Sequence, residues 1–558
     1  MSSRAFSNTR SRRGLEDARC RLTAPRVKLD NCAQREHLVR ARFHSVAICL
    51  SAATVGTAGC NKSTLSLGPD AGTPDGGGGN PGSSDGGVSV LEHHNHPSRD
   101  GVYVDASLTK TAAAGMHLDP AFNATIQGPT YAQPLYLDNG RGGQDLIFAA
   151  TEQNIVYALD AATGSVVWQR NLGAPVPVSR LPCGNINPLG ITGTPVIDLE
   201  SRTLFVDAMT TPDSGQTKKH LVFGLSIDDS SIRPGWPIDV SAVVTSPLQF
   251  NSAVQNQRSA LALLNRTLYV AYSGLWGDCG TYHGWVLGLP LASPSAVTAW
   301  HTRAQGGGIW GPSGVASDGS SLFVATGNTT GTSIWQDGEA VFRFDPGPVF
   351  SGQPASYFTP DDWKYLDDTD LDLGGVGPVL LTLQGSTPLS LVVALGKNGK
   401  AYLLNANNLG GQSAGGVFSA TVASNEIITA AAAYATPQGS YVVFRGQGTN
   451  CPGSAGDLVA LKVSGSPPSF STAWCANQNG SGAPIATSTD GLANAIVWSV
   501  GAEGDNRLRG FDADTGQVVF AGGGASEAMG FVRRFQTPIV AKGRIFVAAD
   551  NRIYAFKP

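Results

Sequence analysis

Short runs of alternating apolar and polar residues, separated by turn residues, recur along most of the chain. Tyr157–Trp168 alternates on both sides of a Thr-Gly turn, which is the pattern of a β-hairpin. The pattern returns in Gly510–Phe520 and, more loosely, in Ala401–Gly410. A second recurring unit is a short apolar strand that begins at a proline, as in Thr194–Asp198 and Thr537–Val540. Such repetition predicts a repeat protein built from antiparallel strands.

The repeated units can be counted if each is taken as four strands. Eight units result, at residues 128–172, 190–240, 252–302, 308–359, 372–422, 428–476, 482–522 and 535–558. The last unit holds only three strands, Gln536–Val540, Arg544–Ala548 and Arg552–Phe556. Because an unpaired edge strand promotes aggregation, we expect a segment within Tyr103–Ile126 to supply the missing strand. The sequence therefore predicts an all-β fold, an eight-bladed β-propeller closed by an N-terminal strand.

The hairpin motif carries a family resemblance. Tyr157-Ala-Leu-Asp-Ala-Ala-Thr-Gly164, followed by Trp168, resembles the tryptophan-docking repeat of the quinoprotein (pyrroloquinoline-quinone-type) β-propeller family. A bacterial group of exported quinoprotein-like proteins of unclear activity is similar in four further stretches, Tyr131–Tyr136, Gly190–Asp198, His283–Val286 and Gly396–Leu404. The resemblance spans roughly residues 95–558 and implies a quinoprotein alcohol dehydrogenase-like propeller. It is specific for the fold and much less so for an activity.

The N-terminal region has the pattern of an export signal. A basic flank from Arg40 precedes the apolar run Val46–Cys60, which is too short for a transmembrane helix. Ala58-Gly59-Cys60 resembles a bacterial lipobox, whose cysteine becomes diacylated, although Thr57 stands where leucine is usual. Ordinary cleavage with free secretion is the alternative. We expect an exported lipoprotein of the outer membrane or cell surface, on its periplasmic or extracellular face, held to the membrane by a lipid on Cys60.

The domain organisation follows from these segments. Residues 1–60 are expected to form an N-terminal extension and lipoprotein signal peptide. Residues 61–95, rich in Gly, Pro, Ser and Asp, have the composition of a disordered linker. The propeller is expected to occupy residues 96–558, and we expect a monomer.

Composition and charge narrow the class of partner. The chain has 70 Gly, 33 Pro and only 14% charged residues, as expected of a turn-rich β-protein. Residues 1–60 contain 11 of the 38 basic residues and 4 of the 42 acidic ones, so the remainder holds 27 basic and 38 acidic residues, a formal net charge of −11. This acidic balance argues against nucleic acid as a partner.

Four cysteines beyond Cys60 indicate disulfides, since the protein is expected to be exported. In the predicted blades, Cys451 lies in the loop between the second and third strands of unit six, and Cys475 ends the same unit. Cys183 lies in the loop before unit two and Cys279 in the second-to-third-strand loop of unit three. All four are therefore expected on one face of the ring, paired as Cys451–Cys475 and Cys183–Cys279.

Several motifs that suggest chemistry do not match their templates. Asp367–Gly374 alternates carboxylates but lacks the glycine and glutamate of a helix-loop-helix calcium site. Gly411–Gly415 matches the nucleophile-elbow pattern without the strand–turn–helix context. His93-His94-Asn95-His96 is expected to be a solvated lead-in rather than a metal site. Vicinal cysteines and a haem-attachment motif, which would favour a quinone-dependent dehydrogenase, are absent from the sequence, so we assign neither pyrroloquinoline quinone nor calcium as a cofactor, and no metal.

The loop face that carries the cysteines is the expected contact surface. We expect a non-catalytic binding or scaffold module with a protein or carbohydrate ligand on this face. Two alternatives stay open, a divergent quinone-dependent oxidoreductase and a propeller enzyme active on polysaccharides; a role in envelope assembly is a third. Packing of His283 between blades is an equally good interpretation of that residue. The candidate ligand-binding residues are Arg258, Asp278, His283, Trp310, Asn328, Lys397 and Glu503, with Glu152 on the same face.

Overall fold

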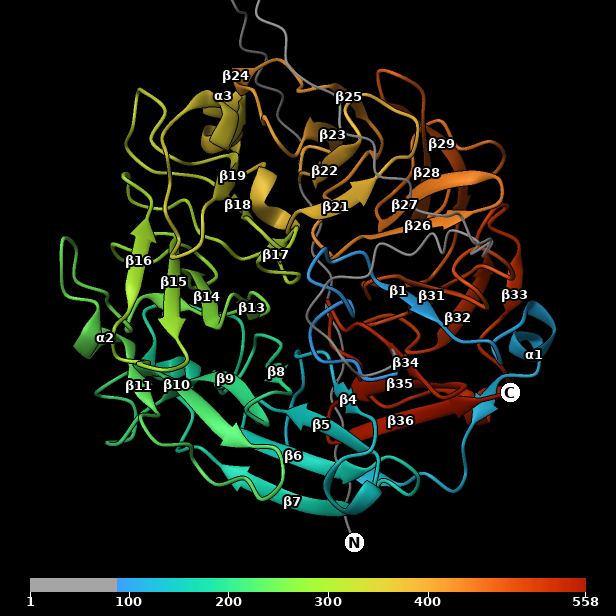
Figure 1. The fold of residues 1–558 in the computed structure, drawn as a ribbon, viewed down its shortest axis with the longest axis horizontal. Helices are drawn as coiled ribbons and strands as arrows, with labels where there is room; N and C mark the ends of the chain where they lie inside the picture. Colours follow the sequence, from blue (N-terminus) through green and yellow to red (C-terminus); the bar gives the residue numbers. More distant parts are fainter. Residues whose placement is uncertain (1–87) are drawn as a thin grey trace, which may run out of the picture. The chain divides into compact units, whose positions relative to one another are not determined.

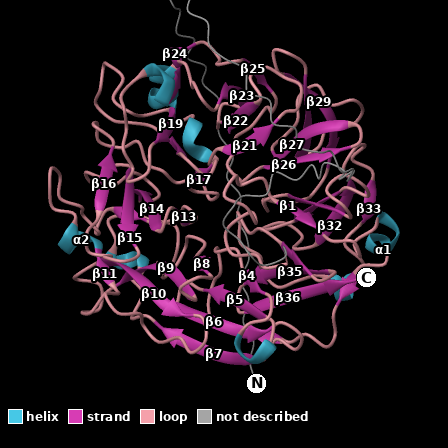
Figure 2. Cartoon of the chain, in the orientation of Figure 1, coloured by secondary structure: helices cyan, strands magenta, loops and turns pink. Residues whose placement is uncertain are grey.

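Eight β-sheets follow one another around a ring in residues 88–558, the part of the chain that a computed structural model describes (Figures 1 and 2). The predicted eight-bladed β-propeller is confirmed, and each blade is built around one of the eight repeated units; Gly411–Ser413, from the fifth unit, adds a strand to the fourth blade. The α-helices of this part are short: α1 (Lys110–Ala114), α2 (Val240–Val243) and α3 (Trp363–Thr369). In residues 88–558, no helix is long and apolar enough to cross a membrane. The export signal and Cys60 lie outside the described residues.

In blades 1 to 4 the first strands lie nearest the centre of the ring and the last strands at its outer edge (Figure 1). Blade 1 consists of β4 (Leu135–Leu137), β5 (Leu146–Ala150), β6 (Ile155–Asp160) and β7 (Val166–Asn171). Blade 2 consists of β8 (Val196–Asp198), β9 (Thr203–Thr210), β10 (Lys219–Ser226) and β11 (Ile238–Asp239). Blade 3 consists of β12 (Gln255–Asn256), β13 (Ala262–Leu264), β14 (Thr267–Gly274), β15 (Trp285–Pro290) and β16 (Thr298–His301). Blade 4 consists of β17 (Ala316–Ser317), β18 (Leu322–Thr326), β19 (Ala340–Phe344), β20 (Tyr357–Pro360) and an added β24 (Gly411–Ser413).

Blades 5 to 8 continue the pattern. Blade 5 consists of β21 (Val379–Thr382), β22 (Ser390–Leu395), β23 (Lys400–Asn405) and β25 (Phe418–Thr421). Blade 6 consists of β26 (Ala432–Thr436), β27 (Gly439–Arg445), β28 (Leu458–Ser464) and β29 (Ser469–Ala476). Blade 7 consists of β30 (Ile485–Ser488), β31 (Ile496–Val500), β32 (Leu508–Asp512) and β33 (Val518–Phe520). Blade 8 has β34 (Ile539–Ala541), β35 (Arg544–Ala549) and β36 (Arg552–Lys557).

The outer edge of blade 8 is covered by residues that precede blade 1. The short strands β2 (His117–Leu118) and β3 (Ala124–Thr125) both pair antiparallel with β36. Strand β36 thus has β35 on one side and β2 with β3 on the other. Residues 117–125 therefore lie at the outer edge of blade 8.

The Asp-Ala-Ala-Thr-Gly turn of the repeat has a local physical cause. One carboxylate oxygen of Asp160 accepts hydrogen bonds from the backbone N–H of Ala162 at 3.0 Å and of Thr163 at 2.6 Å. Such side-chain bonds substitute for missing backbone partners in a tight turn. In blade 7, Asp512 accepts the equivalent bonds from Asp514 and Thr515, both at 3.0 Å.

The tryptophan of the repeat joins one blade to the next. Trp474 on β29 donates its indole N–H to the carbonyl of Ala513 in blade 7, at 2.8 Å. The turn glycine Gly516 has a φ of 71°, and a Cβ there would lie 2.7 Å from the Trp474 ring. This glycine is therefore required both by its backbone conformation and by the close approach of the tryptophan. Trp168 repeats the arrangement between blades 1 and 2, with its N–H 3.0 Å from the carbonyl of Ile227.

Residues 88–104 run along the inside of the ring (Figure 1), with most of their side chains buried or half-buried and those of His96 and Val104 exposed. Their backbone bonds to inner strands of successive blades, from β4 through β8, β17, β21 and β26 to β30. Strand β1 (Val102–Val104) pairs parallel with β30. The expected linker thus ends earlier than residue 95, and the expectation of a solvated lead-in at His93–His96 is wrong for His93 and His94, which are 2% and 0% exposed. The burial follows from inner-strand backbone groups, which the segment satisfies in place of water. We call residues 88–104 the channel plug.

Candidate ligand-binding cavity on the loop face

A cavity of about 330 Å³ opens among the loops that connect the blades. Apart from Arg258, which lies between β12 and β13 of blade 3, the lining residues come from, or directly flank, loops between the strands of a blade or loops between blades. Blades 3, 4 and 5 contribute most of the wall. The lining residues are Asn185, Arg258, Ser273, Gly274, Leu275, Trp276, Gly277, Asp278, Tyr282, Gly308, Trp310, Asn328, Asp370, Asp372, Lys397, Glu426, Ile428, Arg534 and Phe535.

Three basic side chains line this cavity, and two of them, Lys397 and Arg534, form ion pairs. Arg258, the third, forms none with residues 88–558. Its guanidinium carbon lies 6.0 Å from the ring centre of Trp310 and 5.9 Å from that of Phe535. Within residues 88–558, its side chain forms no hydrogen bond and no ion pair. Burial lowers the pKa of Arg258 from its ordinary value, because the charge is withdrawn from water, although the nearby Tyr131 and Glu152 favour the charged form. The side chain therefore presents a charged, fork-shaped donor set at the cavity wall.

Asp372 organises the opposite part of the wall. One of its carboxylate oxygens accepts the indole N–H of Trp310 at 3.2 Å and pairs with the Lys397 ammonium at 2.8 Å. The other accepts the backbone N–H of Asn328 at 2.8 Å. Lys397 also pairs with Asp370 at 2.8 Å, and these two carboxylates raise its pKa above the ordinary value despite burial. Trp310 and Lys397 are thus held in place by a buried carboxylate that is itself fully paired.

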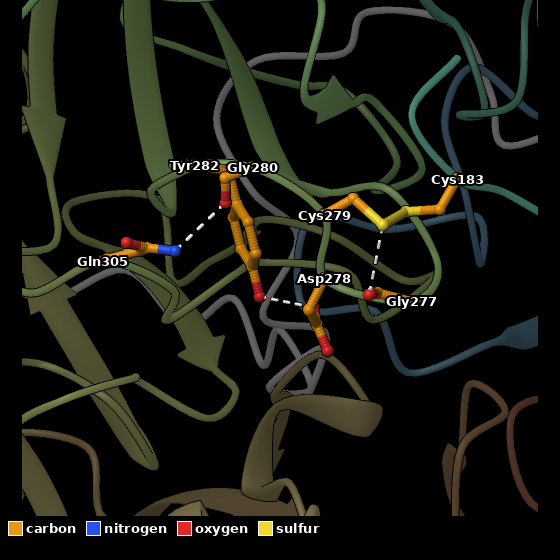
Figure 3. Close-up of a disulfide and its surroundings, with 7 residues drawn as sticks. All are labelled: Cys183, Gly277, Asp278, Cys279, Gly280, Tyr282 and Gln305. Atoms are coloured by element: carbon orange, nitrogen blue, oxygen red, sulfur yellow. Dashed lines mark hydrogen bonds between the residues drawn. A yellow bond between two sulfur atoms is a disulfide. The ribbon is translucent and has the colours of Figure 1, made fainter.

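A disulfide supports the third part of the wall (Figure 3). Cys183, in the loop between blades 1 and 2, is bonded to Cys279, and their Cα atoms are 6.0 Å apart. Residues 275–280 follow β14 and carry Trp276, whose side chain is 62% exposed at the cavity rim. In the same loop, Asp278 accepts the hydroxyl of Tyr282 at 2.6 Å. The disulfide therefore holds a loop that presents both an exposed indole and a carboxylate.

Both disulfides predicted from the sequence are confirmed. Cys451, between β27 and β28, is bonded to Cys475 on β29, with a Cα–Cα distance of 5.6 Å. Two disulfides fit a protein of an oxidising, exported compartment.

Glu152 is a buried acid near the cavity. It follows β5, and its carboxylate accepts the backbone N–H of Gly190 at 2.6 Å and the hydroxyl of Thr192 at 2.8 Å. Burial raises the pKa of Glu152 to about 7, and these hydrogen bonds together with the charges of Arg258 and Arg533 oppose the shift. Near neutral pH, Glu152 therefore changes its charge within electrostatic reach of Arg258.

The structure brings five of the seven candidate residues into one cavity: Arg258, Asp278, Trp310, Asn328 and Lys397. Glu503 does not line it, but pairs at 2.7 Å with Arg534, which does. His283 lies elsewhere, in a second cavity of about 440 Å³ that Trp285 also lines. Its ring packs 5.6 Å from that of His301, and its Nδ1 lies 2.9 Å from the carbonyl oxygen of Thr302. His283 is therefore separate from the loop-face cavity, and its ring contacts lie within blade 3 and the loop that follows it.

Several lining residues have no signal in the sequence. Phe535 and Arg534 stand in the loop before blade 8, and Trp276 stands next to the glycine-rich turn that ends in Cys279. Asp370 and Asp372 belong to the carboxylate run that suggests a calcium loop, but both pair with Lys397. Charge balance alone predicts that a basic residue lies beside these carboxylates. That this residue is Lys397 follows from the closure of the ring, which brings it beside Asp370 and Asp372.

No protein-family model and no curated protein sequence matches the chain. Solved structures do match. The quinohemoprotein alcohol dehydrogenase from Comamonas testosteroni superimposes with a TM-score of 0.57 at 12% identity, over 84% of this chain and 80% of that one. A europium-containing methanol dehydrogenase superimposes with a TM-score of 0.55 at 13% identity, over 83% and 89%.

These likenesses establish the fold. The quinoprotein-type eight-bladed propeller implied by the repeat is confirmed, and at this level of identity the comparison carries no activity to this chain. Among residues 88–558, no group of three or more His, Cys, Asp or Glu side chains has an arrangement that could hold a metal ion.

Proposed function

We propose that the protein is a binding module whose loop-face cavity takes a small ligand bearing a carboxylate or similar oxyanion. The observation that carries this proposal is Arg258, a guanidinium that lines the cavity and, among residues 88–558, has no carboxylate or carbonyl partner. A partly buried charge without a partner is costly, and an incoming anion would offset that cost.

The aromatic side chains indicate the rest of the ligand. Trp310 and Phe535 flank the guanidinium, and the exposed Trp276 stands at the rim. Rings of this kind favour a flat or ring-shaped ligand that stacks while its anionic group reaches Arg258. We therefore expect a ring-bearing carboxylate to bind better than its neutral analogue.

Most of the other charged groups of the cavity wall are paired, which favours a binding role over a catalytic one; of the remaining carboxylates, Asp278 accepts the Tyr282 hydroxyl and Glu426 lines the cavity at an exposed position. Asp372 and Asp370 both pair with Lys397, and Arg534 pairs with Glu503. A general acid or base needs a group that is free to exchange a proton with the ligand. The alternative of a quinone-dependent oxidoreductase rests on the shared fold. The carboxylates of Asp370 and Asp372 are both paired with Lys397, so these residues do not fit a calcium site.

Isothermal titration tests the proposal, with quinoline-2-carboxylate as the probe and quinoline as its neutral analogue. We expect the carboxylate to bind and Arg258→Met to weaken its affinity by about 10- to 100-fold, as for a lost charge-assisted hydrogen bond. Arg552→Met is the matched control, because Arg552 also lies over a ring, that of Tyr554 at 4.9 Å, but outside the cavity. Equal binding of both compounds, or equal loss in both variants, would contradict an anion site at Arg258.

We further propose that the propeller is exported and tethered through a lipid on Cys60. The two disulfides and the apolar run Val46–Cys60 support this proposal. Cys60→Ser should move the native protein from the membrane fraction to the soluble fraction. Unchanged fractionation, or a native mass without the diacylglycerol addition, would contradict it.

A further inference from the structure

The channel plug makes ordered contacts with the inner wall of the ring. The backbone of Val90 exchanges two hydrogen bonds with Tyr136 of blade 1, at 2.8 and 3.0 Å. The carbonyls of Ser98, Asp100 and Gly101 accept bonds of 2.8–2.9 Å from blades 5, 6 and 7. The channel plug is therefore hydrogen-bonded to one blade after another and cannot shift without breaking several of these bonds.

Arg99 is the centre of the plug and is 0% exposed. Its Nη1 donates to the Glu92 carboxylate and to the carbonyl of His93, both at 2.8 Å. Its Nη2 donates to the carbonyl of Leu261 and its Nε to that of Val315, both at 2.9 Å. One guanidinium thus joins the plug to the start of the inner strands of blades 3 and 4.

These contact points belong to the segments that carry the anion site. Leu261 follows Arg258 by three residues, and Val315 follows Trp310 by five. A third contact joins His93 of the plug to the hydroxyl of Thr537, at 3.4 Å, two residues after Phe535. Arg258, Trp310 and Phe535 come from three different blades, and the plug is bonded to all three segments.

We propose that the channel plug positions the anion site, so that seating of the plug and binding of ligand in the loop-face cavity stabilise each other. Arg99 and His93 are positioning residues in this arrangement: they hold the segments of Arg258, Trp310 and Phe535 and do not touch the ligand. Coupling of this kind is reciprocal, because each event favours the same arrangement of the three segments. The inference rests on the proposed anion site.

Hydrogen exchange of the full-length wild-type protein, followed by mass spectrometry, tests the coupling directly. At a quinoline-2-carboxylate concentration ten times its dissociation constant, exchange of peptides covering residues 90–101 should slow by up to about tenfold, the factor expected for full linkage. Peptides covering β33, an outer strand of blade 7, should not change. Unchanged exchange in residues 90–101 despite bound probe would overturn the coupling.

Arg99→Lys provides the second test, because lysine keeps the charge beside Glu92 but cannot donate in a fork to both Leu261 and Val315. We expect its affinity for quinoline-2-carboxylate to fall at least fivefold. His96→Gln is the matched control, since His96 lies in the same plug but is exposed and bonds to Asp100; its affinity should equal that of the wild type. Equal affinities for all three proteins would overturn the inference.

The outcomes separate the two proposals. If the wild type does not bind quinoline-2-carboxylate at all, the anion site fails and the coupling fails with it. If the wild type binds and Arg258→Met does not, the anion site stands. The response of residues 90–101 and of Arg99→Lys then decides the coupling alone.

Discussion

Arg99 in the channel plug and Arg258 in the loop-face cavity have the same side chain in two different situations. Arg99 donates to one carboxylate and three carbonyls and is 0% exposed. Arg258 lies only three residues before Leu261, whose carbonyl accepts one of these bonds. Its neighbours are nevertheless two aromatic rings, and in the described part of the chain its N–H groups have no acceptor. A guanidinium whose N–H groups are hydrogen-bonded within the protein, as in Arg99, stabilises the fold. One whose N–H groups have no such acceptors, as in Arg258, is available to a ligand.

The largest expected effect separates the two arginines by stability. Arg99→Met leaves Glu92 without its partner inside the ring and should lower the free energy of unfolding by about 3–5 kcal/mol. Arg258→Met breaks no bond of the fold and should change it by less than about 1 kcal/mol. Denaturant unfolding followed by tryptophan fluorescence measures both, and equal losses would remove the distinction.

The two disulfides sharpen the comparison, since only one supports the cavity. Replacing Cys183 and Cys279 by serine opens a loop with a sequence separation of 96, and on the chain-entropy model should cost about 4.7 kcal/mol. The same change at Cys451 and Cys475, with a separation of 24, should cost about 3 kcal/mol. Probe affinity should fall in the first variant and not in the second. Weaker binding in both would show that general loosening, rather than the Trp276 loop, affects the cavity.

A buried ion pair within blade 2, between His220 on β10 and Asp207 on β9, offers a third test, because all of its hydrogen-bonding groups have partners, as those of Arg99 do. Both ring nitrogens of His220 face acceptors, Asp207 at 2.7 Å and the carbonyl of Gln255 at 3.1 Å, an arrangement that favours the doubly protonated ring. Asp207 raises the pKa of His220 above its ordinary value although burial opposes this. His220→Gln should cost about 3 kcal/mol at pH 6.

The pH dependence of that pair has a definite sign. Because the folded pKa of His220 is raised above 6.5, its stabilisation is fully present below pH 6.5 and is lost as pH rises through the folded value. The difference in unfolding free energy between wild type and His220→Gln should therefore shrink toward alkaline pH. A difference that grows with pH would contradict a charged His220.

The smallest expected effect is the pH response of the cavity itself. Glu152, with its pKa raised by burial to about 7, is neutral at pH 6 and charged at pH 8, where it offsets the charge of Arg258. Affinity for quinoline-2-carboxylate should be a few-fold higher at pH 6 than at pH 8, and Glu152→Gln should flatten this dependence. Wild-type titrations that show no change over this range would separate Glu152 from the site.

The ring and its covalent links could be predicted because their signals are local. The Asp-Ala-Ala-Thr-Gly turn encodes its own hydrogen bonds through Asp160, and Gly516 with Trp474 marks the contact between blades. Once these repeats are counted, the position of each cysteine within its blade decides the pairing. The same counting places Arg258, Trp310 and Lys397 on one face.

Proximity within that face could not be predicted. His283 and Asp278 both lie in the loop between β14 and β15, yet Asp278 lines the loop-face cavity and His283 lines the second cavity. Glu503 reaches the cavity only through Arg534. Side-chain direction around a loop depends on contacts with other blades, which no local pattern records.

The number of blades, the approximate span of each blade, the two disulfides and the face that carries the cavity could all be worked out from the sequence, because a period of one blade repeats the same turn and packing requirements. The entry of residues 88–104 into the ring and the lack of a hydrogen-bonding partner for Arg258 among residues 88–558 became visible only in the folded structure. A short polar segment such as His93–His96 has the composition of a linker, and it is buried here because the closed ring presents inner-strand backbone groups that need partners. Those groups exist only after eight blades have come together.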